Sequence, residues 1–348
     1  MKEQIHGGDV YRHPGVLDFS SNMNPLGTPP AVIEAAARSL KKIAHYPDIR
    51  CTALTEALAD YEQVPPEQII CGNGAADLIF SLVQAVRPKK ALVQAPTFAE
   101  YAQALETVGC AVKYYDSSCR NFRINRDYLE MLEERPDIVF LCNPNNPTGF
   151  LIESEILGEI ANVCEKRDIL LVVDECFQDF ISDEERHTLK SRLSGNGRLF
   201  LLKAFTKRYA MAGLRLGYGL CSDSGLLERM GRVTQPWNVS IPAQAAGVAA
   251  LKECAYVREG RRIVAEELPR MKREMAAAGL RVYDSRANYI FFRGPEDLKE
   301  RCLKQGVLIR SCSNYPGLDS GYFRVAVRRR EENDVLLRAL QSQKCRGR

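Results

Sequence analysis

Four short stretches of the chain combine residue types that could carry chemistry, and the first would suit a phosphate group. It is Cys71-Gly72-Asn73-Gly74-Ala75-Ala76-Asp77, a glycine turn before a helical pattern. Glycines let the backbone approach an anion, and a helix N-terminus offers unpaired N–H groups. A Rossmann dinucleotide site would have a third glycine where Asp77 stands. The stretch therefore favours a monophosphate cradle, with an ordinary tight turn as the alternative.

The other three stretches supply an amide, a carboxylate and an amine. Residues 143–149 contain two Asn-Pro steps, which stiffen the loop and could hold an asparagine amide in one orientation. Asp174 and Glu175 end an apolar strand pattern, where a carboxylate is costly unless a cation pairs with it. For Glu175 we expect an ordinary solvated strand end. Lys207 could form a Schiff base in a desolvated site, although on its own it would be interpreted as a surface lysine.

Each of these stretches directly follows a predicted strand. Between about residues 68 and 220, short apolar runs alternate with helical patterns such as 75–87 and 98–108. Strands separated by helices predict a largely parallel sheet covered on both faces, whose ligand crevice lies outside the carboxyl ends of the strands. We expect the strands at 68–71, 91–95, 138–142, 170–173, 199–202 and 216–220.

The pattern changes from about residue 241, which predicts a second domain. One long helix is expected up to residue 278, then strands at 281–283, 288–292, 307–310 and 322–327, and a last helix at 331–340. The fold class is therefore α/β, a large domain with a mostly parallel central sheet plus a smaller α+β domain. We expect an N-terminal segment at 1–45 that contributes to the active site and the small domain, the large domain at 46–240 and the small C-terminal domain at 241–348.

Composition excludes several classes of protein. The 348 residues include 48 Lys and Arg against 44 Asp and Glu, a balance that does not indicate nucleic-acid binding. No apolar run approaches the roughly 18 residues of a membrane span, and no secretory signal begins the chain, so we expect a cytoplasmic protein. The twelve cysteines show no C-x-x-C spacing, which predicts reduced, mostly buried thiols and no metal site.

Together the four stretches resemble the fold-type-I, pyridoxal-5′-phosphate (PLP) enzymes of the class I/II aminotransferase superfamily, in the histidinol-phosphate aminotransferase branch. The resemblance runs from about residue 16 to residue 340. It implies that Lys207 forms the Schiff base with PLP, because the family arginine follows that lysine by eight residues, as Arg215 does here. Lys203 mimics the same family segment and competes for this role.

The same resemblance implies roles for the residues around the cofactor. Asp174 would pair with the pyridine nitrogen, Asn146 would bind the phenolic oxygen and Phe98 would stack on the ring. The cofactor phosphate would lie at the turn of Gly74, Ala75 and Ala76, with Thr206 and Arg215. Tyr46 matches a tyrosine that reaches this phosphate from the neighbouring subunit, which implies a homodimer with a shared active site.

Further segments resemble the threonine-phosphate decarboxylase family within this branch: 6–9, 18–27, 96–101, 310–314 and 323–328. The resemblance implies a phosphorylated amino acid as substrate, bound by His6, Asn22, Asn146, Arg310 and Arg324, with Asn288 nearby. From the residues alone, Arg310 and Arg324 each lie in an apolar strand pattern, where a guanidinium needs an anion. His6 alone would be interpreted as a surface histidine.

One position departs from the aminotransferase pattern D-E-x-Y, because Phe177 stands where the tyrosine would be. A phenylalanine cannot donate a hydrogen bond to the phenolic oxygen of PLP. We therefore expect a Schiff base with a higher pKa than in an ordinary transaminase. The expected reaction is decarboxylation of L-threonine O-3-phosphate to (R)-1-aminopropan-2-yl phosphate, a step of cobalamin biosynthesis. Histidinol-phosphate transamination with 2-oxoglutarate is the alternative, and a non-catalytic PLP-binding protein is the third.

Overall fold

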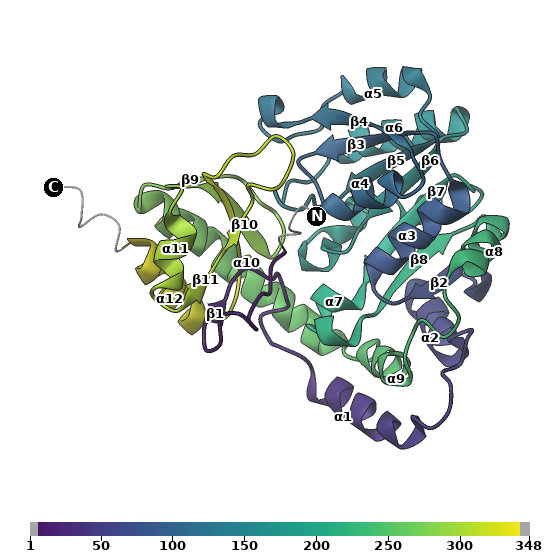
Figure 1. Ribbon diagram of the computed structural model, residues 1–348, viewed down its shortest axis with the longest axis horizontal. Coiled ribbons are helices and arrows are strands. Elements are labelled where there is room, and N and C mark those ends of the chain that lie inside the picture. The colour runs from purple at the N-terminus through teal and green to yellow at the C-terminus, as the bar shows by residue number, and fades with distance from the viewer. Residues whose placement is uncertain (1–5, 342–348) are drawn as a thin grey trace.

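A seven-stranded sheet forms the centre of the larger part of the molecule in the computed structural model, which describes residues 6–341 (Figure 1). Strands β3 to β7 run parallel to one another, whereas β8 is antiparallel to both β2 and β7. The prediction of a largely parallel sheet is confirmed. In spatial order the strands are β2 (Ile69–Gly72), β8 (Gly217–Cys221), β7 (Leu199–Ala204), β6 (Leu170–Asp174), β5 (Ile138–Cys142), β3 (Lys90–Ala95) and β4 (Ala111–Asp116).

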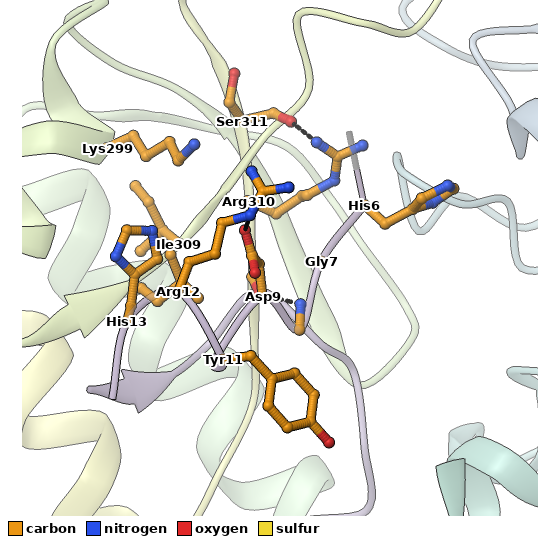
Figure 2. Close-up of a pocket in the computed structure, with 13 residues that line it drawn as sticks. His6, Gly7, Asp9, Tyr11, Arg12, His13, Lys299, Ile309, Arg310 and Ser311 are labelled. Atoms are coloured by element: carbon orange, nitrogen blue, oxygen red, sulfur yellow. Dashed lines mark hydrogen bonds and ion pairs between the residues drawn. The ribbon is translucent and has the colours of Figure 1, made fainter. Parts of the chain in front are cut away.

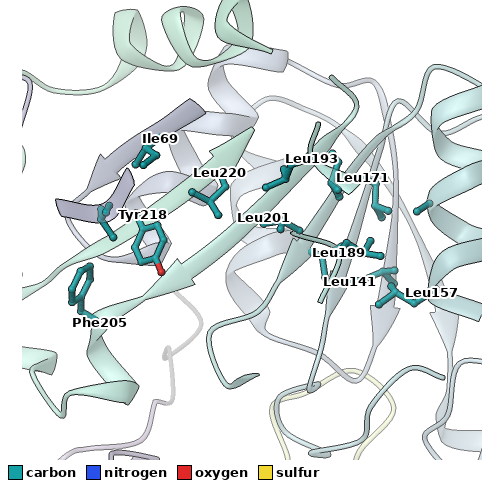
Figure 3. Close-up of a cluster of buried hydrophobic side chains, with 14 of the residues drawn as sticks. Ile69, Leu141, Leu157, Leu171, Leu189, Leu193, Leu201, Phe205, Tyr218 and Leu220 are labelled. Atoms are coloured by element: carbon teal, nitrogen blue, oxygen red, sulfur yellow. The ribbon is translucent and has the colours of Figure 1, made fainter. Parts of the chain in front are cut away.

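Helices cover both faces of this sheet, because its central strands are apolar on both sides. In β5, for example, Phe140 packs into the core on one face. Leu141 packs into the core on the other face (Figure 3). The first face is covered by α3 (Ala75–Val86), α4 (Ala99–Glu106) and α8 (Ser224–Val233). The second is covered by α2 (Thr52–Glu62), α5 (Tyr128–Met131), α6 (Ser154–Lys166) and α9 (Ile241–Ala250).

The long helix predicted from 241 to 278 is in fact two helices, α9 and α10 (Cys254–Ala277). The chain leaves the helical conformation at Glu253, where φ is −85° and ψ is 47°. The two helices serve mainly different cores: α9 packs with α2 against the large sheet, and so does Val257 at the start of α10, while Val264 and Met271 of α10 belong to the core of the second sheet. The continuous helical pattern concealed this change of partner.

The second sheet is antiparallel, in the order β12 (Arg310–Ser311), β13 (Tyr322–Ala326), β10 (Tyr289–Arg293) and β9 (Arg281–Val282). Helices α10, α11 (Leu298–Leu303) and α12 (Arg330–Gln341) pack with it. The single strand predicted at 307–310 is divided at Ile309, because β11 (Val307–Leu308) pairs instead with β1 (Leu17–Asp18). The beginning of the described chain is thereby joined to its last third.

Helix α1 (Pro30–Ser39) extends from the body of the molecule and packs on α9 (Figure 1). The predicted domain boundaries at 45/46 and 240/241 fall outside the helices and strands, and the division remains a prediction. None of the helices in residues 6–341 is long and apolar enough to cross a membrane. The eleven cysteines in this range are unpaired, and most of them are buried.

Candidate active site

The predicted chemical residues meet at one edge of the large sheet. The parallel strands β3, β5, β6 and β7 end at this edge, and so does β2, which runs parallel to β7 because both are antiparallel to β8. The loops that follow these strands therefore lie side by side. The strand ends and the segments that follow them carry Gly74, Phe98, Asn146, Asp174 and Lys207.

The glycine turn forms a cradle against Arg215. Gly74 has a positive φ of 85°, and a Cβ placed on it would lie 2.5 Å from Arg215 Nη2. Helix α3 begins at Ala75 with no side-chain cap, so the N–H groups of Ala75 and Ala76 lack acceptors within the helix. Thr206 is buried directly before Lys207 in α7 (Phe205–Arg208). Backbone donors and a guanidinium together suit a phosphate group.

Asp174 is a buried carboxylate, only 5% exposed, at the end of β6. The Tyr101 hydroxyl donates to its Oδ2 at 2.5 Å and the Cys176 N–H to its Oδ1 at 2.9 Å. Burial raises the pKa of Asp174 despite these hydrogen bonds. A cation placed against this carboxylate would relieve the cost of its burial.

Lys207 is the amine of the site and is partly buried. Its Nζ lies 5.8 Å from the centre of the Phe177 ring. Burial, followed by the charges of Arg324 and Arg215, lowers the pKa of Lys207 from its ordinary value of 10.5 to about 8. A lysine with such a pKa exists in both protonation states near neutral pH, so it can act as nucleophile, acid or base.

Lys203, the competing lysine, is engaged in a buried ion network instead. Its Nζ lies 3.3 Å from Glu175 Oε2 and 3.7 Å from Glu62 Oε1, and these carboxylates hold its pKa above the ordinary range. The expectation of a solvated Glu175 is therefore wrong, since this side chain is 1% exposed and also accepts hydrogen bonds from Thr188 and Leu189. Lys203 is thus held as a charged structural group.

Arg324, on β13, is a buried guanidinium that joins three parts of the chain. It donates to Asn146 Oδ1, and its Nη2 donates to the Ser20 carbonyl at 2.7 Å. Asn22 also faces it, and its amide oxygen in the appropriate orientation accepts from Arg324 Nε at 3.3 Å. The nearby Asn288 side chain donates to the backbone carbonyl of Asn22 at 3.1 Å, which holds this segment in place.

Arg310 lies opposite Arg324 on the paired strand β12 and is 4% exposed. Its guanidinium donates to the Ser311 carbonyl and to Asn314 Oδ1. His6 lies nearby in the N-terminal segment, with its Nδ1 3.5 Å from Glu100 Oε1. Burial raises the pKa of Glu100, and the cations His6, Arg310 and Lys207 act against that rise. His6 and Arg310 both line a cavity of about 370 Å³ (Figure 2).

Tyr46 is the predicted residue that this single chain does not bring to the site. Its ring is 76% exposed and stacks on Trp237 with the ring centroids 4.4 Å apart. Phe98, by contrast, is close to the site, since its ring lies edge-on to Tyr101, the residue bound to Asp174. Among residues 6–341, no three His, Cys, Asp or Glu side chains are grouped so that they could hold a metal ion.

Residues 14–340 match the family described as aminotransferase class I and II. The chain belongs to this family. The fold-type-I architecture predicted from the sequence is therefore confirmed, since the large mostly parallel sheet and the smaller α+β part are both present.

Two relatives show the range of activities in this aminotransferase family. The chain is 39% identical to a threonine-phosphate decarboxylase of Salmonella typhimurium, over 97% of this chain and 96% of the relative. It is 34% identical to a histidinol-phosphate aminotransferase of Moorella thermoacetica, over 96% of this chain and 87% of the relative. Relatives of both predicted kinds are enzymes, and the prediction of a PLP-dependent enzyme is confirmed at the level of the family.

Solved structures agree with this assignment. A histidinol-phosphate aminotransferase of Clostridium acetobutylicum superposes with a TM-score of 0.88 at 29% identity, covering 94% of this chain and 99% of the other. The Sinorhizobium meliloti histidinol-phosphate aminotransferase has a TM-score of 0.86 at 22% identity, covering 98% and 95%, and was solved in complex with pyridoxal-5′-phosphate. PLP is the cofactor of the family, as predicted.

The residues of this aminotransferase-family site fit PLP on structural grounds. The Gly74 cradle would hold its phosphate, because a side chain at that position would collide with Arg215. Asp174 would face its ring nitrogen, because a protonated nitrogen would be the cation that the buried carboxylate lacks. Lys207 would supply the amine, since Lys203 is bound by two carboxylates.

Three residues around this site were not assigned roles from the sequence. Tyr101 was recognised only as part of a motif, although it follows Phe98 by one helical turn and so shares its face. Tyr289 contacts the edge of the Phe177 ring and donates to the Asn145 carbonyl at 2.7 Å. Glu100 approaches His6 across a long sequence separation, which no local pattern signals.

The pKa of Lys207 leads to a testable pH dependence. Capture of added PLP by cofactor-free protein should accelerate with pH up to about 8 and then level off, because only the neutral amine is a nucleophile. Below that pH each unit should slow capture about tenfold. The growth of visible absorbance in a pH series measures the rate. An inflection near the ordinary pKa of 10.5 would show that Lys207 is not desolvated.

Proposed function

We propose that this protein is a PLP-dependent decarboxylase of a phosphorylated amino acid, and that its substrate is L-threonine O-3-phosphate. The product would be (R)-1-aminopropan-2-yl phosphate, a precursor in cobalamin biosynthesis. The 39% identity to the Salmonella typhimurium threonine-phosphate decarboxylase over nearly the whole chain supports this assignment. His6, Asn22, Asn146, Arg310 and Arg324 are proposed as the substrate-binding residues.

One observation carries the proposal: Arg310 and Arg324 are paired in register on neighbouring strands, and both are buried. Two neighbouring guanidinium groups suit a ligand with two anionic groups, and threonine phosphate has both a carboxylate and a phosphate. The charge of Arg324 acts on Lys207, so we assign it to the carboxylate, which is bonded to the reacting carbon. Arg310 lies beside His6 in the cavity and is assigned to the phosphate.

The residues of the chain divide the work of the reaction between them. When bound, PLP supplies a conjugated ring that accepts the electron pair of the bond broken at Cα. Arg324 and Arg310 fix the substrate at both ends, and the closely packed segment at Ser20 and Asn22 limits the access of water. After CO2 leaves, Cα needs one proton, and the Lys207 ammonium donates it from Nζ. The pKa of about 8 suits Lys207 to this acid role near neutral pH.

Histidinol-phosphate transamination is the second candidate function, supported by the 34% identity to the Moorella thermoacetica enzyme. Histidinol phosphate has a phosphate but no carboxylate, although the co-substrate 2-oxoglutarate has two carboxylates, and enzymes of this reaction normally have a tyrosine where this chain has Phe177. Phe177 is 5% exposed and packs between Lys207 and Tyr289, so it contributes no hydroxyl there.

A direct assay distinguishes the two reactions. The holoenzyme should release CO2 from L-threonine O-3-phosphate without any added 2-oxo acid, and L-threonine should be turned over far less efficiently. If L-threonine, which lacks the phosphate, had the same kcat/KM as L-threonine O-3-phosphate, the assignment of Arg310 to the substrate phosphate would be contradicted. Conversion of histidinol phosphate that depends on 2-oxoglutarate, without release of CO2 from threonine phosphate, would establish the second candidate instead.

We further propose that the protein is a homodimer in which Tyr46 completes the active site of the partner. The stretch around Tyr46 exposes several large apolar side chains, as expected of a surface that a second copy covers. They are Ile33, Leu40, Ile43 and Ile49, together with Trp237, on which Tyr46 stacks.

Hybrid dimers should reveal the shared site. Tyr46→Phe should weaken PLP binding about 10- to 100-fold, because one hydrogen bond to a charged phosphate is lost. Lys207→Ala should be inactive. Co-expression of the two variants gives hybrids with one intact site, formed by Lys207 of one chain and Tyr46 of the other. Activity at limiting PLP should therefore exceed that of either variant alone. Activity equal to the average of the separate variants would argue for independent sites.

A further inference from the structure

The cavity of about 370 Å³ beside Arg310 extends well beyond the proposed substrate site (Figure 2). Its walls come from the N-terminal segment, from the strand region 308–311 and from Lys299 on α11. Neither Lys207, Asp174 nor Arg324 lines it. Its volume exceeds that of a phosphate group and falls within the range of small-molecule sites. The cavity therefore offers room for a whole phosphorylated molecule outside the reacting centre.

The walls of this cavity are strongly biased towards positive charge. Arg12, Lys299 and Arg310 are fixed cations, and Asp9 is the single carboxylate among the lining residues, which also include His6 and His13. Arg12 is held by Asp9, with Nε 3.5 Å from Oδ2. In the described part of the chain, neither the Lys299 ammonium nor the His13 ring has a hydrogen-bond or ion-pair partner. Figure 2 shows both side chains beside Arg12 at the same end of the cavity.

Basic side chains that converge on a concave surface create a field that attracts anions. Lysine suits a transient phosphate contact, because its ammonium is a compact charge on a flexible stem without the fixed geometry of a guanidinium. The phosphate monoester should therefore meet Arg12, His13 and Lys299 first. It should then transfer to Arg310 and His6, which line the same cavity and border the reacting centre.

We propose that Arg12, His13 and Lys299 form a second anion-binding site that captures phosphate monoesters on their way to and from Lys207. The ligand is the phosphorylated substrate or product, so the assigned role rests on the proposed function. The site raises the local concentration of substrate and makes association dependent on ionic strength, without contact with the reacting atoms.

The test compares Lys299→Ala with Lys304→Ala in the holoenzyme. Both lysines belong to the α11 region, but Lys304 is the exposed residue that follows the helix and does not line the cavity. For Lys299→Ala we expect an increase in KM for threonine phosphate of about 3- to 10-fold with kcat unchanged, and a weaker salt dependence of kcat/KM. Lys304→Ala should behave as the unaltered protein. Equal effects of the two substitutions would overturn the proposal.

A binding measurement separates this inference from the proposed function. Inorganic phosphate, titrated calorimetrically into the holoenzyme without substrate, should bind several-fold more weakly to Lys299→Ala than to Lys304→Ala. If threonine phosphate is not decarboxylated but this difference is found, the anion site stands and the assigned reaction fails. If decarboxylation occurs but phosphate binding is the same in both variants, the anion site fails and the reaction stands.

Discussion

Replacement of Lys207 by alanine is expected to abolish CO2 release from threonine phosphate, with a loss of about 10⁴-fold or more in turnover. The substitution removes both the amine that would attach PLP and the acid that would protonate Cα. The purified variant should also lack the visible absorbance of attached cofactor. Both effects are measured on one preparation, by CO2 release and by absorption spectroscopy.

Lys203→Met is the matched control for this experiment, because it removes the other lysine of the same segment. It should keep the colour of attached PLP, since Lys203 binds Glu62 and Glu175 rather than the cofactor. Breaking this buried network should lower the free energy of unfolding by about 3–5 kcal/mol, detected by chemical denaturation. A colourless Lys203→Met that remains folded would transfer the role of attachment from Lys207 to Lys203.

Arg324→Gln is expected to lower kcat/KM for threonine phosphate by about 10³-fold, because a charged, hydrogen-bonded contact to the substrate carboxylate is lost. The charge of Arg324 also depresses the pKa of Lys207, second only to burial. The substitution should therefore raise the pKa of Lys207, and the pH at which capture of PLP levels off should increase. Steady-state kinetics and the pH series of cofactor capture measure the two effects separately.

Arg293→Gln controls for a general disturbance of the second sheet, because Arg293 is a largely exposed residue of β10 that pairs with Asp319. Arg293→Gln should alter neither kcat/KM for threonine phosphate nor the pH dependence of PLP capture. A substantial kcat/KM for Arg324→Gln, with the pH series unchanged, would place Arg324 outside the site. The kcat/KM of Arg324→Lys should lie between those of Arg324→Gln and Arg293→Gln, because the lysine keeps the charge but cannot bind Asn146 and Ser20 together.

The sequence predicted the elements of the large sheet well because its central strands are apolar on both faces. Strand β4 was not predicted, since it is an edge strand whose Lys113 and Tyr114 are exposed and break the apolar run. The site loops were predicted by the resemblance, and the parallel topology then explains why they lie together. Local pattern alone could not reveal that the predicted helix across Glu253 changes its packing partner.

The surroundings of the two lysines depended on contacts that are distant in the sequence. Glu62 reaches Lys203 from α2, so the sequence around Lys203 did not predict the ion pairs that hold this lysine. Distant contacts also explain the error at Glu175, which is buried and whose partners are Lys203 and Thr188. Tyr46 remains a prediction because its expected partner belongs to a second copy of the chain.

The pairing of β1 with β11 has a consequence for how the protein is made. The first described strand leaves the ribosome early, yet its partner is translated after most of the polypeptide. Lys207, Asp174 and the Gly74 turn are synthesised before either Arg310 or Arg324. A prematurely terminated product that ended before residue 307 would contain every residue proposed to bind PLP but neither of the arginines proposed to bind the substrate. The quality of recombinant preparations should therefore be judged by turnover and intact mass rather than by colour.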